Sequence, residues 1–127
     1  MTTTPIPDDV RRYILAAVPS VPYIEALLLL RSDASRAWEP AAVAHRLYVT
    51  EADAAAVLRA LGDAGVATLR GDAWAYAPAD EDLRVLLERV ADAYSSQLVA
   101  VTEIIHSRVE RRARQFADAF RWKKEER

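Results

Sequence analysis

The stretch between Trp38 and Tyr76 constrains the fold more than any other part of the chain, because its local signals come in a fixed order. Pro40 suits the first turn of a helix, since the N–H that it lacks would have no partner there. Four apolar residues follow at helical spacing: Ala42, Val43, Leu47 and Tyr48. Thr50 is a favourable N-cap for a second helix, with acidic residues after it at the positive end of the helix dipole. The pattern predicts two short helices joined by a tight turn.

A hairpin signal follows the second helix. Val57, Leu58 and Leu61 give that helix an apolar face, and Gly65 occupies the position where a left-handed C-terminal cap is expected. Residues 66–70 and 73–76 read as strands around a two-residue turn, Gly71-Asp72. Alternation along paired strands then puts four side chains on one face: Ala67, Leu69, Trp74 and Tyr76. We expect Trp74 to pack against the body of the domain.

Composition limits the architecture and the chemistry. The chain has 127 residues, three Gly and no Cys, which favours one mainly helical domain and excludes disulfides and thiolate metal sites. The longest apolar run, 24–30, contains Glu25 and is too short to span a membrane, and no signal sequence opens the chain. We therefore expect a cytoplasmic protein that makes no membrane contact.

The flanking segments also read as helices. Asp8 or Asp9 can cap a short helix that carries Val10, Tyr13, Ile14 and Ala17 and that Pro19 stops. Pro22 begins another helix, whose apolar residues 24–30 cover more than one side. Such a helix is expected to be buried and to support the two that follow. Beyond Pro78, apolar residues recur every three or four positions from Leu83 to Ile105. This predicts a helix of about 25 residues, which would span roughly 38 Å.

The C-terminal helices predict self-association, because so long an apolar stripe exceeds what a small domain can cover. We expect a homodimer whose interface includes Leu98, Val101, Ile105, Phe116 and Phe120. Covering of the stripe by residues 24–30 of the same chain is the intramolecular alternative. Ser107 and Glu110 have capping-box spacing, which would allow the helix to break and restart there.

Charge is unevenly distributed along a chain whose net charge is −2. Residues 80–103 carry a net −4 and residues 104–127 a net +4. A nucleic-acid-binding protein usually shows a basic surface, so any phosphate contacts here would have to be local. The residues best placed for DNA are Arg46, Thr50, Arg59 and Arg70, at the turn, on the second helix and near the hairpin tip. Glu51 and Asp53 oppose them, because both carboxylates repel phosphate.

The sequence gives little support to catalysis. His45 and His106 are the only imidazoles, and neither has an acidic or histidine partner at i±4. The three glycines, at 62, 65 and 71, do not form a phosphate-binding loop. Asp80-Glu81-Asp82 is explained by the electrostatics of a helix N-terminus. We expect no enzyme activity, no cofactor and no metal.

The order of elements resembles winged helix-turn-helix bacterial transcriptional regulators of the MarR and PadR kind. The residues that carry the resemblance are Trp38-Glu39-Pro40, the Val57-Leu58 to Gly65-Val66 segment and the Gly71-Asp72 turn. The resemblance implies three segments: an N-terminal arm and short helix (1–21), a winged-helix domain (22–78) and a helical dimerisation segment (79–127).

The resemblance also implies a DNA-binding regulator that works as a dimer. Two alternatives stay open at this stage. A winged helix can serve as a protein–protein interaction module that leaves DNA alone, or as part of a small-molecule sensor with a pocket between the hairpin aromatics and the long helix. The run of alanines in the second helix, where such regulators usually carry polar and basic residues, keeps the interaction module in contention.

Overall fold

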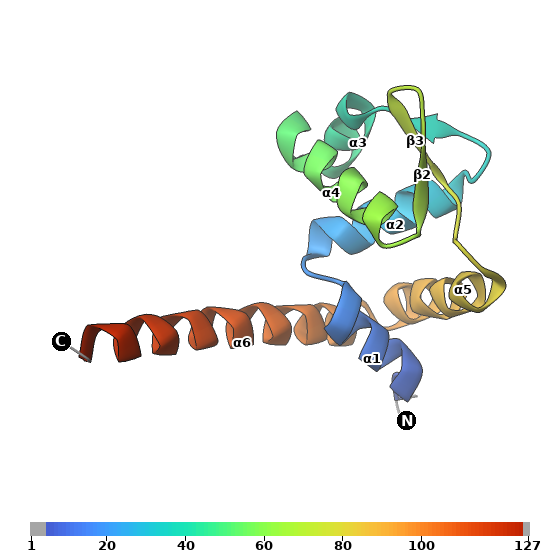
Figure 1. The fold of residues 1–127 in the computed structure, drawn as a ribbon. Coiled ribbons are helices and arrows are strands. Elements are labelled where there is room, and N and C mark those ends of the chain that lie inside the picture. Colours follow the sequence, from blue (N-terminus) through green and yellow to red (C-terminus); the bar gives the residue numbers. More distant parts are fainter. Residues whose placement is uncertain (1–4, 126–127) are drawn as a thin grey trace.

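The computed structural model describes residues 5–125, with side chains described as far as residue 119. It is mainly helical, with a small antiparallel sheet (Figure 1). The elements in chain order are α1 (Asp8–Ala17), α2 (Val21–Ser32), β1 (Ala37–Trp38), α3 (Pro40–Leu47), α4 (Glu51–Asp63), β2 (Ala67–Arg70), β3 (Ala73–Tyr76), α5 (Glu81–Ser96) and α6 (Leu98–Glu125).

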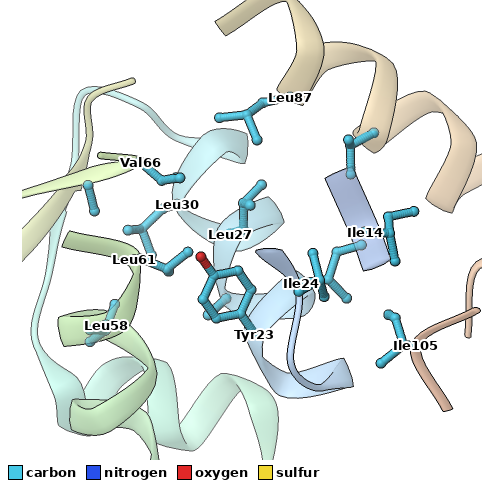
Figure 2. Close-up of a cluster of buried hydrophobic side chains, with 14 of the residues drawn as sticks. Ile14, Tyr23, Ile24, Leu27, Leu30, Leu58, Leu61, Val66, Leu87 and Ile105 are labelled. Carbon is cyan, nitrogen blue, oxygen red and sulfur yellow. The ribbon is translucent and has the colours of Figure 1, made fainter. Parts of the chain in front are cut away.

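Helix α2 is the centre of the core, as predicted from the apolar residues that cover more than one of its sides. Its buried residues are Tyr23, Ile24, Ala26, Leu27 and Leu30. Figure 2 shows this helix between Leu58 and Leu61 of α4 on one side and Ile14, Leu87 and Ile105 of α1, α5 and α6 on the other. One hydrophobic cluster therefore joins the three segments that the sequence predicts.

The two short helices and the hairpin form where the sequence predicts them. The Thr50 side chain accepts a hydrogen bond from the Asp53 N–H at 3.0 Å, and Gly65 has the left-handed φ of 78° that ends α4. Strands β2 and β3 pair in the predicted register, with Leu69 opposite Trp74 and Arg70 opposite Ala73. Gly71 at the turn has a φ of 63°, a conformation that favours glycine.

A third strand was not predicted. The two residues of β1 pair with β3, with Trp38 opposite Trp74, so the order across the sheet is β1-β3-β2. Trp38 is buried, at 2% exposed, and its backbone is held in the sheet by β3.

The break in the C-terminal helix lies ten residues earlier than Ser107. Gln97 leaves helical geometry, with φ −137° and ψ 53°, and α6 then runs without interruption from Leu98 through Ser107 to Glu125. The capping-box prediction at Ser107 is therefore wrong, because the exposed Ser107 lies inside a continuous helix. The first part of α6 packs against α1 and α5, whereas its second part projects away from the rest of the fold (Figure 1).

Among the described residues, no single helix has both the length and the apolar composition needed to cross a bilayer. The bent pair α1 and α2, at 114° to each other, meets those two criteria only when the helices are taken together.

Candidate nucleic-acid interface

The turn between α3 and α4 holds an unusual residue. Tyr48 has φ 58° and ψ 42°, and it is the one non-glycine residue with positive φ in the described part of the chain. Its N–H donates to the Ala44 carbonyl, so it caps α3 instead of extending the apolar face of that helix, and the prediction for its side chain is wrong. That side chain is 95% exposed. A strained backbone thus presents an aromatic ring to solvent directly before α4.

The solvent face of α4 is made of short side chains and one arginine. Ala54, Leu58 and Leu61 are buried, which turns Ala52, Ala56 and Arg59 outward. Asp63 follows on the same side at the end of the helix. Ala52 and Ala56 let another molecule come close to the helix backbone on this face, although the exposed carboxylates of Glu51 and Asp53 flank it in the first turn.

The arginines around this face are exposed and carry no counter-ion within the described residues. Arg36, Arg46, Arg59 and Arg70 all fall in this class. Of the other described arginines, Arg31, Arg84 and Arg89 are paired with Glu88, Glu81 and Asp9 respectively, whereas Arg11, Arg12 and the described arginines of α6 form no ion pair. The guanidinium groups predicted to contact DNA are therefore free of carboxylates inside the described structure.

Trp38 brings two of these arginines to one place. The guanidinium carbon of Arg36 lies 3.7 Å from the centroid of the Trp38 ring, and that of Arg46 lies 5.8 Å from it. Both distances allow a cation–π interaction. Arg36 directly precedes β1 and Arg46 lies in α3. Only Arg46 was predicted as a contact, because β1 itself was not foreseen.

Three carboxylates lie together near the N-terminal end of α4. Glu39, Glu51 and Asp72 line a cavity of about 390 Å³ together with Pro40 and Ala41. The cavity brings together the starts of α3 and α4 and the hairpin turn, three places separated in sequence. Two of its acids stand at helix N-termini, Glu39 as the N-cap of α3 and Glu51 in the first turn of α4, where the helix dipole offsets part of their charge.

The sites predicted for dimerisation separate into two groups. Val101 and Ile105 are completely buried within the single chain and belong to its core, so their assignment to a dimer interface is wrong. Leu98 and Phe116 are 50% and 75% exposed and stay available to a partner. The Phe120 side chain lies outside the described side chains. Val109, which is 46% exposed, was not in the predicted set, although its helical spacing from Leu98 and Phe116 could have revealed it.

Trp74 packs against Gly62 of α4, as predicted for a side chain turned toward the domain. Within the described part of the chain, no group of three or more His, Asp or Glu side chains has the geometry to hold a metal ion.

Comparison with known proteins gave no match: no family model, no curated protein and no solved structure matches this chain. Function therefore has to be inferred from the geometry of its own side chains.

Proposed function

We propose that residues 22–78 form a winged helix-turn-helix unit that binds double-stranded DNA, in a regulator of transcription that acts as a dimer in the cytoplasm. Binding, and not catalysis, is its activity. The order helix, strand, two helices and hairpin, with the sheet order β1-β3-β2, supports a winged helix. In such a unit α4 enters the major groove, and the hairpin and the end of α3 flank it.

One observation carries this proposal: the arginines around α4 lack internal counter-ions. Arg46, Arg59 and Arg70 are exposed on α3, α4 and β2, and none forms an ion pair with a described residue. A phosphate backbone supplies the missing negative charge. The charges of the acids at the starts of α3 and α4 are partly offset by helix dipoles, and so is that of Arg46 in the last turn of α3. Arg59 and Arg70 do not lie in the last turn of a helix.

The short outer face of α4 supports the same function. Ala52 and Ala56 allow the helix to approach base edges closely, and an alanine methyl can contact the thymine methyl group. Arg59 lies one turn further along for a backbone or guanine contact. Tyr48 precedes α4 with its phenol exposed, in position to donate to a phosphate oxygen.

The test is a salt titration of DNA binding by fluorescence anisotropy. Three arginine contacts in each subunit amount to about six phosphates per dimer, so the slope of log affinity against log salt should be about −5. A mixed-sequence duplex and the duplex upstream of the gene itself serve as the two probes. Flat anisotropy with both probes at about 50 mM salt, where phosphate attraction is strong, would contradict DNA binding.

The acidic cavity favours a second candidate, a protein–protein interaction module. Glu39, Glu51 and Asp72 would attract a basic segment of another protein to the start of α4. This module would bind no DNA at any salt concentration. The same titration therefore separates the two candidates.

A further inference from the structure

Helix α6 carries an exposed apolar stripe along nearly its whole described length. Of the seven large hydrophobic side chains that are exposed between residues 5 and 119, four lie on this helix: Leu98, Val99, Val109 and Phe116. Val109 and Phe116 are 11 and 18 residues from Leu98, which is about three and five whole helical turns. Leu98, Val109 and Phe116 therefore share one side of α6, and the exposed Ala113 lies beside them.

The stripe borders the face that α6 buries in its own chain. The buried residues Val101, Ile104 and Ile105 contact the core, whereas the stripe runs next to them and continues where α6 projects beyond the body (Figure 1). Thr102 lies along the stripe, and its hydroxyl group donates to the carbonyls of Leu98 and Val99. It therefore adds no unsatisfied polar group to this surface.

Charge along α6 indicates what covers the stripe. Residues 110–125 carry Arg111, Arg112, Arg114, Arg121, Lys123 and Lys124 against Glu110, Asp118 and Glu125, a net of +3. Residues 98–109 are neutral, with Glu103 and Arg108, and the adjoining α5 carries a net −2. A parallel pair of α6 helices would place two positive ends side by side. An antiparallel pair places each positive end beside a neutral stretch next to an acidic helix.

We propose that a second copy of this chain covers the stripe, with the two α6 helices antiparallel and the two-fold axis at Val109. Residues whose numbers sum to 218 then lie opposite each other, so that Phe116 of one copy meets Thr102 of the other. The proposal deepens the dimer of the proposed function and rests on that dimer alone, not on DNA binding.

Single-cysteine cross-linking tests this arrangement on a chain that has no cysteine of its own. Disulfide formation needs Cβ atoms about 4 Å apart. At the two-fold axis the Val109→Cys variant meets its own copy and should cross-link on mild oxidation. Leu98→Cys and Phe116→Cys should not, because their copies lie about 33 and 21 Å away along the axis. Arg114→Cys, on the opposite side of α6, is the matched control and should stay uncross-linked.

A mixture of two variants fixes the register. Thr102→Cys and Phe116→Cys should give a mixed disulfide together and none separately. Self-cross-linking of the Leu98, Val109 and Phe116 variants alike would establish parallel helices and overturn the proposal. A sedimentation mass of 14.1 kDa at micromolar concentration, with no cross-link from any variant, would overturn it as well.

A second substitution separates loss of the interface from loss of the fold. Phe116→Glu changes an exposed side chain, so the variant should keep the helical circular dichroism of the wild type while sedimenting as a monomer. Anisotropy with the mixed-sequence duplex, run on the same variants, keeps the two proposals apart. DNA binding without the Val109 cross-link would contradict only the antiparallel dimer, and a cross-link without DNA binding would contradict only the regulator.

Discussion

Gly62 of α4 lies directly beneath the indole of Trp74. A Cβ at residue 62 would lie 2.8 Å from Trp74 Cη2 and closer still to Cζ3. Replacing glycine with alanine in a helix ordinarily stabilises a protein by about 0.5–1 kcal/mol. Here Trp74 would have to move, and we expect Gly62→Ala to lower the free energy of unfolding by about 1–3 kcal/mol, as overpacking does. Urea denaturation measures the change.

A double-mutant cycle attributes that loss to the indole. Trp74→Ala alone should cost about 3 kcal/mol, at the low end for a tryptophan because the side chain is half-buried. In the Trp74→Ala background the methyl group of Gly62→Ala meets no ring, so the substitution should be neutral or stabilising. Equal effects of Gly62→Ala in both backgrounds would refute the contact.

The left-handed backbone of Tyr48 lowers the stability of the protein, and its ring is exposed to solvent. A left-handed backbone costs an L-residue roughly 1–2 kcal/mol, and the 95% exposed side chain recovers little through packing. Tyr48→Gly should therefore raise the free energy of unfolding by about 1 kcal/mol, after allowing for the greater freedom of glycine in the unfolded chain. If the phenol contacts DNA, the same variant should bind a duplex about two- to tenfold more weakly.

Tyr48→Ala is the matched control for that prediction. Alanine keeps the backbone strain and removes only the ring, so stability should change by less than about 0.5 kcal/mol while DNA binding weakens as in Tyr48→Gly. A stability gain in both variants would show that the ring and not the backbone is the unfavourable feature.

Local rules in the sequence predict the elements but not all of their contacts. The Thr50 cap, the left-handed Gly65 and the Gly71-Asp72 turn are each set by neighbouring residues, and the structure has all three. Strand β1 depends on pairing with β3, in which Trp38 lies opposite Trp74, 36 residues later in the chain, so no local signal marks it. Gln97 likewise ends α5 without a glycine or proline.

The candidate interface likewise combines features that the local sequence predicts with features that depend on tertiary packing. The sequence identifies Arg46, Arg59 and Arg70 as exposed cations on the expected elements. It does not show that Glu39 and Asp72 share a cavity with Glu51, because only the packing of α3 and the hairpin brings them together. Periodicity alone likewise cannot tell the buried Ile105 from the exposed Val109, since α1 and α5 decide which side of α6 is covered.

A salt bridge between Arg31 and Glu88 should make stability depend on pH. Arg31 Nε donates to Glu88 Oε1 at 3.0 Å, and the second pair of atoms, Nη2 and Oε2, is also in contact, which ties α2 to α5. This hydrogen bonding holds the pKa of Glu88 below its usual range. The stabilisation is then present above the ordinary glutamate pKa, about 4.3, and is lost as the pH falls through the lower pKa of the folded state.

The Glu88→Gln variant measures that contribution. At pH 7 it should be less stable than the wild type by at most about 1 kcal/mol, because the pair is partly exposed. The difference should shrink as the pH falls below about 4. A difference that stays constant between pH 7 and pH 3 would mean that the ion pair contributes nothing.

Arg70 is the simplest cation with which to test DNA contact, since it is exposed near the hairpin turn. Arg70→Ala removes one phosphate contact per subunit, so the salt slope of DNA binding should fall in magnitude by about 2 per dimer, without a change in sequence preference. Arg84→Ala is the control, because Arg84 is paired with Glu81 on α5 and should leave the slope unchanged. Equal effects of the two substitutions would indicate attraction by overall charge instead of a local contact.

Glu51 should affect DNA binding in the opposite direction to Arg70, and its substitution therefore distinguishes the two candidate functions. Its carboxylate stands in the first turn of α4, beside the acidic cavity, where a DNA phosphate would be repelled. In a DNA-binding regulator Glu51→Gln should tighten binding to a mixed-sequence duplex, roughly threefold or more at low salt, with a smaller gain as salt screens the repulsion. Asp82→Asn is the matched control, because Asp82 occupies the first turn of α5 instead and should leave binding unchanged. In an interaction module neither substitution produces DNA binding, and Glu51→Gln should weaken the attraction for a basic peptide such as an oligo-lysine. Tighter duplex binding by Glu51→Gln alone would support the regulator, and weaker peptide binding with no duplex signal would support the module.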